Sequence, residues 1–203
     1  MPKVTADYSE ARRMQIIDAA YRCFARKGFH QASMRDIYQE AQLSPGAIYH
    51  YFRSKEEIIA ASFERDLQRS LGPFEEALSQ TDSRLALDQL IDFFFSGLAA
   101  AAELDANRVN IQGWAEALIN PKLLQTINRA FSDYRAMLTQ LFRQAQERGV
   151  IDAELDPESL ARMLISLYLG LELQTAWEPG QVNVSQYTTA VKMLLNRTSR
   201  PKP

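Results

Sequence analysis

One short segment, residues 44–53, contains several residues that can bind phosphates and base edges. At 100° per residue of helix, Ile48 and Phe52 fall together on one side and form an apolar face. The other side offers a bare backbone, a phenol, an imidazole and a guanidinium, which belong to Gly46, Tyr49, His50 and Arg53. These groups let a nucleic acid approach closely and be bound through its phosphates and base edges. The segment therefore predicts a nucleic-acid contact on one face of a helix.

Two neighbouring residues extend this face. Ala47 lies at its border, where its methyl group would meet a thymine methyl. Lys55 stands in the first turn of the next predicted helix, where its ammonium and the free amides of that turn would bind one phosphate. Residues 1–55 carry nine basic and five acidic side chains, a net charge of +4 within a chain of net charge −2. A basic region in an acidic chain favours a polyanionic partner, although an ordinary solvated face can carry the same excess.

The elements that must hold these residues are short helices with recognisable starts. Ser33, Ser44 and Ser54 each begin a helix as N-caps, because a serine hydroxyl accepts a hydrogen bond from the free amides of the first turn. The apolar spacing predicts helices over residues 9–27, 33–41, 44–52 and from 54 onward. Two short helices between two longer ones have the layout of a helix-turn-helix. In that motif the first short helix braces the second, which enters the DNA major groove.

The remainder of the chain shows the same helical period and no alternating strand pattern. The helix that starts at Ser54 should kink or end at Gly72-Pro73. Five further helices are predicted over residues 83–102, 105–119, 122–148, 157–177 and 184–197. The fold class is therefore all-α, with about nine helices.

The composition excludes several classes of protein. A single cysteine, Cys23, leaves no disulfide, and two histidines, His30 and His50, make no metal cluster. No two glycines lie closer than Gly170 and Gly180, so the sequence has neither a phosphate-binding loop nor a dinucleotide fingerprint. The longest uncharged stretches are too short to cross a bilayer. We expect a cytoplasmic protein that is not an enzyme and that has no metal, no cofactor and no membrane partner.

A dense set of motif residues spans about residues 9–61. It consists of Ala19-Ala20, Phe24, Gly28-Phe29, the run from Ser33 to Ile37, the run from Leu43 to Phe52, and the run from Ser54 to Glu57. Through this set the chain resembles the TetR family of transcriptional regulators. The resemblance implies a three-helix DNA-binding domain over residues 9–55, with the helix-turn-helix at about 33–52. The DNA contacts that it implies are Ser33, Arg35, Ser44, Pro45, Gly46, Ala47, Tyr49, His50 and Lys55. Ala47 stands where the family commonly has threonine, so one hydroxyl is absent.

Residues 56–198 resemble the family's ligand-binding and dimerisation domain, and residues 1–8 and 199–203 are expected to be flexible tails. Aromatic and acidic residues of this domain predict a ligand pocket lined by Phe93, Phe94, Trp114, Glu116, Tyr134, Tyr168, Glu172 and Trp177. Apolar residues of the last two helices predict a dimer interface formed by Leu160, Leu164, Leu167, Leu171, Tyr187, Val191 and Leu194. Each aromatic residue could instead belong to the core, and one apolar face could merely seal that core.

The resemblance implies a homodimeric repressor that binds an inverted-repeat operator in double-stranded DNA and leaves it when a small-molecule effector binds. The alternative is a helical adaptor that binds only protein, through an exposed apolar face. The basic recognition helix argues against the adaptor. Salt-dependent DNA binding would separate the two, because binding to phosphates weakens steeply with salt.

Overall fold

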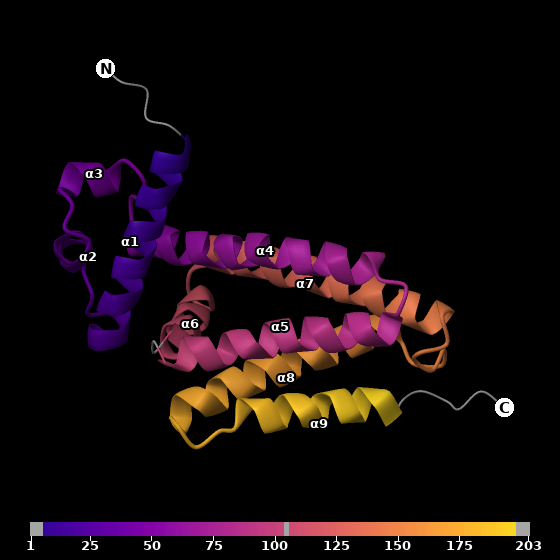
Figure 1. Ribbon diagram of the computed structural model, residues 1–203. Helices are drawn as coiled ribbons and strands as arrows, with labels where there is room; N and C mark the ends of the chain where they lie inside the picture. Colours follow the sequence, from indigo (N-terminus) through magenta and orange to yellow (C-terminus); the bar gives the residue numbers. More distant parts are fainter. Residues whose placement is uncertain (1–5, 104–105, 198–203) are drawn as a thin grey trace. The chain divides into compact units, whose positions relative to one another are not determined.

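The computed structural model describes residues 6–103 and 106–197, and every regular element within them is an α-helix (Figure 1). The helices of these residues are α1 (Ala6–Lys27), α2 (Met34–Glu40), α3 (Pro45–Tyr49), α4 (Lys55–Ser79), α5 (Ser83–Glu103), α6 (Ala106–Ala117), α7 (Pro121–Glu147), α8 (Pro157–Trp177) and α9 (Val184–Arg197). The all-α class predicted from the sequence is confirmed. Of the expected tails, residues 6–8 belong to α1, while residues 1–5 and 199–203 lie outside the described residues, as does Asp105, the expected start of the sixth helix.

Helix starts follow the predicted caps more closely than helix ends follow the predicted stops. The Oγ of Ser33 and that of Ser44 each accept a hydrogen bond, at 3.3 Å, from the backbone amide three residues later. The helix α3 ends at Tyr49, three residues before the predicted end. The helix α4 continues through Pro73 instead of ending there. The ring of Phe74, directly after the proline, is buried in the core, and this packing holds the helix together where one backbone hydrogen bond is missing.

The described residues pack into two compact units, each with its own buried side chains. We call residues 6–65 with 108–128 the head unit and residues 66–107 with 129–197 the body unit. The units therefore do not divide at the predicted boundary between residues 55 and 56, because the head unit also takes in the first turns of α4 and most of α6. Ile59 of α4 is fully buried, and its Cγ2 would lie only 3.2 Å from a β-carbon at Gly113 of α6.

In the body unit, α5 lies beside both α8 and α9 (Figure 1). The core of this unit is built from apolar side chains of five helices, among them Phe74, Leu87, Phe95, Phe142, Leu171 and Val191.

No helix in the described parts of the chain is long and apolar enough to cross a membrane. Among these residues there is also no group of three or more His, Cys, Asp or Glu side chains placed to hold a metal ion.

Candidate nucleic-acid interface

The helix α2 is fixed at its start by a capping box and an ion pair. Ser33 donates from its backbone amide to Asp36 Oδ2 at 2.9 Å, and the Asp36 amide bonds back to the Ser33 hydroxyl. Lys27 of α1 donates to the Oδ1 of the same aspartate at 2.7 Å. The Lys27 ammonium, followed by the Ser33 hydrogen bonds, holds the pKa of Asp36 well below its usual range. The first turn of α2 is therefore tied to the end of α1.

The end of α2 is tied to α1 in the same way. Glu40 accepts hydrogen bonds from Arg26 at 2.5 Å and from Arg22 at 2.8 Å, and these bonds lower the pKa of the glutamate. Three of the basic residues that make the N-terminal region positive, Arg22, Arg26 and Lys27, thus neutralise carboxylates of α2. The charge excess read from the sequence overstates the number of cations that could meet a polyanion, because a count of charges ignores pairing between helices.

The helix α3 turns its polar residues outward as the helical wheel predicts. Ile48 and Phe52 are buried in the head unit. The side chain of Tyr49 is 49% exposed, and Gly46, His50 and Arg53 are exposed as well. Arg53 belongs to this exposed face although it was not among the nine expected contacts. The helical wheel already places Arg53 on the polar side, so this residue could have been included.

The start of α3 is open on the side of Gly46. A β-carbon built on Gly46 would have no heavy atom within 4 Å, so nothing in the protein requires a glycine there. Ser44 and Pro45 are exposed, and the Ser44 hydroxyl caps the helix. Ala47 is half-buried, in agreement with its place at the border of the wheel.

The remaining expected contacts lie at two different places in the head unit. Ser33 and Arg35 are exposed at the start of α2. Lys55 binds the protein's own backbone, and its expected phosphate contact stays a prediction. Its Nζ donates to the carbonyl oxygens of three residues of the loop between α1 and α2, at distances of 2.5 Å from Phe29, 3.2 Å from His30 and 3.1 Å from Ala32. An ammonium has three donor hydrogens, so these carbonyls occupy all of them and Lys55 holds the loop.

Five of the eight expected pocket residues lie in or beside one aromatic cluster of the body unit. Phe94 of α5 lies 5.5 Å from Phe93, 5.7 Å from Tyr134 of α7 and 6.4 Å from Tyr168 of α8, measured between ring centroids. The side chain of Glu172, one helical turn after Tyr168, is buried. The rings of Phe74, Phe95 and Tyr187 belong to the same cluster. Phe74 and Phe95 were not among the expected pocket residues, and Tyr187 was expected in the dimer interface instead.

The other three expected pocket residues are not part of this cluster. Trp114 and Glu116 lie in the head unit, so the predicted pocket combined residues of two separate units. Trp177 is 72% exposed at the end of α8. These residues were assigned by type alone, and residue type does not determine which unit an aromatic side chain joins.

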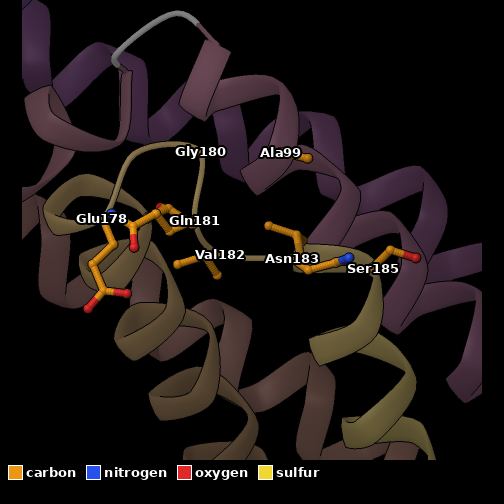
Figure 2. Close-up of a pocket in the computed structure, with 9 residues that line it drawn as sticks. Ala99, Glu178, Gly180, Gln181, Val182, Asn183 and Ser185 are labelled. Carbon is orange, nitrogen blue, oxygen red and sulfur yellow. The ribbon is translucent and has the colours of Figure 1, made fainter.

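An open cavity of about 530 Å³ lies elsewhere in the body unit, at the loop between α8 and α9 (Figure 2). It is lined by Ala99 of α5 and Thr175 of α8, by Glu178 and residues 180–183 of the loop, and by Val184 and Ser185 at the start of α9. None of the expected pocket residues lines it. The Thr175 hydroxyl accepts a hydrogen bond from the Nδ2 of buried Asn107 at 2.8 Å.

Most residues expected at the dimer interface pack within their own body unit, and the interface itself stays a prediction. The side chains of Leu160, Leu164, Leu171 and Val191 are buried in the core of their own body unit. Leu167 and Tyr187 are half-buried and pack against that core, while Leu194 is 61% exposed. The apolar period identifies a stripe on each helix, but it does not say whether the stripe faces the same chain or a partner. The large apolar side chains that do lie exposed on α8 and α9 are Met163, Trp177, Met193 and Leu194.

Two family profiles match the chain. The family profile described as "Bacterial regulatory proteins, tetR family" matches residues 16–62. A second profile, described as "BetI-type transcriptional repressor, C-terminal", matches residues 83–200.

Individual relatives match along most of their length. The HTH-type transcriptional regulator UidR of Escherichia coli (strain K12) is 29% identical over 163 residues, which cover 80% of this chain and 81% of the relative. The fatty acid metabolism regulator protein of Bacillus subtilis (strain 168) is 32% identical over 155 residues, which cover 75% of this chain and 76% of the relative. A transcriptional regulator from Saccharomonospora viridis, solved in complex with choline, superposes with a TM-score of 0.78 at 26% identity and covers 96% of this chain and 100% of that one.

Proposed function

Because the chain belongs to the TetR family of bacterial transcriptional regulators, it is a DNA-binding regulator rather than a protein-binding adaptor, and we propose that it represses transcription through α3 until an effector releases it. The single observation that carries the proposal is the exposed face of α3. Tyr49 and His50 are exposed on it, close to Gly46, where packing within the protein does not require a glycine.

Gly46 supports a close approach of DNA to this face. A glycine inside a helix is about 1 kcal/mol less favourable than alanine, and no neighbour within the protein would clash with an alanine there. Contact with DNA would explain the glycine, because only a residue without a side chain lets a phosphate or a base edge reach the helix backbone. The exposed residues Ser33, Arg35 and Arg53 would then bind the flanking phosphates.

The test is the affinity of a Tyr49→Ala variant for duplex DNA that the parent protein selects from a random-sequence pool. Loss of a contact on the recognition face should weaken binding by about 1 to 3 kcal/mol. The unfolding midpoint should stay near that of the parent, because the side chain is half exposed. Phe93→Ala, which removes an exposed ring from the body unit, is the matched control and should bind as the parent does. Parent-like affinity of the Tyr49 variant would contradict the proposed recognition face.

We further propose that the protein acts as a dimer formed through the outer faces of α8 and α9. Met163, Met193 and Leu194 are exposed there, and Gly170, in the middle of α8, has open space around its β-carbon position. A second copy of the chain would cover these apolar side chains and would use the glycine for close helix contact. Two copies carry two recognition helices, which fits an operator with inverted half-sites.

The proposed effector site is the aromatic cluster around Phe94 in the body unit. Rings from α5, α7 and α8 meet there, and the buried carboxylate of Glu172 lies one turn along α8. Pockets of this kind, between helices of a bundle, are lined mainly by apolar and aromatic groups with a few polar ones. A structural relative holds choline, a cation, and this supports testing cationic as well as apolar effectors.

The effector site is tested with Tyr168→Ala after a compound screen has found a molecule that releases DNA. Removing the ring should raise the releasing concentration about tenfold, which corresponds to ~1.4 kcal/mol. The matched control is Trp177→Ala, because Trp177 was expected in the same pocket and is instead exposed. An unchanged releasing concentration for Tyr168→Ala, or an equal shift for both variants, would argue for a different site.

A further inference from the structure

We propose that Gln112 of α6 is a positioning residue for DNA binding, which acts through the loop between α1 and α2. This loop, residues 28–32, leads directly into Ser33, the N-cap of α2. The inference rests on the proposed DNA contacts of α2 and α3. Gln112 lies far from them in the sequence, and no motif marks it.

The backbone of Phe29 is held from both sides. Its amide donates to Gln112 Oε1 at 2.5 Å, and its carbonyl accepts from Lys55 Nζ, also at 2.5 Å. The Phe29 ring is buried, and the Lys55 ammonium lies 4.6 Å from its centroid. Gly28, with a φ of +79°, provides the turn that brings this amide to Gln112. The loop thus has one fixed position, set by a donor from α4 and an acceptor from α6.

The acceptor is itself held firmly within the head unit. Asn110, two residues earlier on α6, accepts a hydrogen bond from the Tyr21 hydroxyl of α1 at 2.9 Å. Gly113 follows Gln112, and its backbone lies so close to α4 that an added β-carbon would stand 3.2 Å from Ile59 Cγ2. With α6 fixed at these points, the side chain of Gln112 presents its oxygen at a defined place.

Removing this oxygen leaves the Phe29 amide without its partner. A backbone amide that is shielded from water and unpaired is unfavourable, so the loop would move until water or another acceptor reached the amide. A shift of the loop moves Ser33 and Arg35, and it loosens the brace that α2 gives to α3. Lys55 would still bind the loop carbonyls, but it offers no acceptor for the amide. Gln112 therefore supplies a function that its neighbours do not duplicate.

A positioning role is distinguishable from a direct contact with DNA. Each phosphate contact that is lost reduces the salt dependence of binding by about one unit of slope in a plot of log K against log salt. Gln112 uses its oxygen inside the protein, so its removal should lower the affinity and leave this slope unchanged. The exchange rate of the Phe29 amide with deuterium reports the local hydrogen bond independently of DNA.

The experiment compares three substitutions of Gln112 in the full-length protein, with duplex DNA selected by the parent from a random-sequence pool. Gln112→Leu keeps the size and removes the acceptor, Gln112→Asn keeps the amide but falls short of Phe29, and Gln112→Glu keeps an acceptor at full length. Gln125→Leu is the matched control, because Gln125 is an exposed glutamine of the same unit. Affinity is measured at several salt concentrations, and amide exchange and the unfolding midpoint are measured without DNA.

We expect Gln112→Leu and Gln112→Asn to bind DNA about tenfold more weakly, with the parent's salt slope and with faster exchange at Phe29. Gln112→Glu should bind within about twofold of the parent, and so should Gln125→Leu. Should the leucine variant fail to fold, the asparagine and glutamate variants carry the same comparison. Parent-like affinity of the asparagine variant, a salt slope reduced by about one, or a glutamate variant as weak as the asparagine variant would each overturn the inference. Failure of the parent to select any DNA would instead contradict the proposed function.

Discussion

The head unit adds specific polar contacts to the buried apolar side chains that hold its recognition helices, whereas the body unit holds its long helices mainly with apolar side chains. The helices α2 and α3 have 7 and 5 residues and are too short to persist alone. Besides the buried side chains of Ile37 and Ile48, capping hydrogen bonds fix the starts of both helices, and ion pairs to α1 fix α2. The helices α5 and α8 have 21 residues each and share a continuous apolar core. Polar contacts have specific partners and so determine one geometry. An apolar stripe can pack against any apolar surface, so the residues of the stripe do not identify its packing partner.

The largest expected effect separates two leucines of the body unit that look alike in the sequence. Leu171 is fully buried, and Leu171→Ala should lower the free energy of unfolding by about 2 to 5 kcal/mol. Leu194 is 61% exposed, and Leu194→Ala should change protomer stability by less than about 0.5 kcal/mol while it weakens dimerisation. Denaturant unfolding and sedimentation at several protein concentrations measure the two effects. Equal losses of stability at the two positions would remove the distinction between an inner and an outer stripe.

A smaller effect of opposite sign is expected at the two glycines with open surroundings, one in each unit. Gly46→Ala and Gly170→Ala should each stabilise the protomer by about 0.5 to 1 kcal/mol, because alanine suits a helix better and meets nothing within the chain. Gly46→Ala should nevertheless weaken DNA binding, and Gly170→Ala should weaken the dimer without lowering the affinity of the dimer for DNA. Thermal unfolding, DNA titration and sedimentation distinguish these results. A Gly46→Ala variant that is more stable and binds DNA as tightly as the parent would show that DNA does not approach this glycine.

The smallest effect is a difference in acid sensitivity that follows from the ion pairs of the head unit. The pKa values of Asp36 and Glu40 are lowered, chiefly by hydrogen bonds from Lys27 and Arg26 respectively. A lowered pKa means that the stabilisation is present above the unfolded carboxyl pKa of about 4 and is lost as the pH falls through the lower folded value. Asp36→Asn should therefore be less stable than the parent at neutral pH, and the difference should shrink as the pH falls below about 4.

The body unit provides the control for this acid effect. The pKa of Asp156, the N-cap of α8, is also lowered, chiefly by the hydrogen bonds that its carboxylate accepts from Ser159. Asp156→Asn should change the stability of the body unit with pH and leave DNA binding by the head unit intact. Thermal unfolding followed from pH 7 to 3 measures both variants. A stability difference for Asp36→Asn that stays constant over this range would contradict the role of its carboxylate charge.

The separation in sequence between interacting residues explains which features could be predicted. The starts of α2 and α3 were predicted correctly because the hydrogen bonds of Ser33 and Ser44 join residues only three positions apart. The face of α3 was predicted correctly because a short helix beside a core has one apolar side. With these signals the sequence was sufficient for the fold class, the order of the helices and the exposed face of the recognition helix.

Features that depend on distant partners could not be predicted. Lys55 bonds to carbonyls 23 to 26 residues away, and its lysine side chain is equally suited to a phosphate. The partner of Gln112 lies 83 residues away, and nothing in the local sequence distinguishes this glutamine from an exposed one. Trp114 and Tyr168 were grouped because both are aromatic, but the chain carries them into different compact units.

The head unit is assembled from two separate stretches of chain, residues 6–65 and 108–128, and this limits how the regulator can be recombined. A chimera made by joining the first 65 residues to a foreign sensory domain would leave out Asn110, Gln112 and Gly113. The Tyr21 hydroxyl and the Phe29 amide would lose the partners that α6 provides, and Ile59 would lose its close neighbour. A biosensor built from this protein must carry residues 108–128 with the graft, or offer an equivalent helix from its new host.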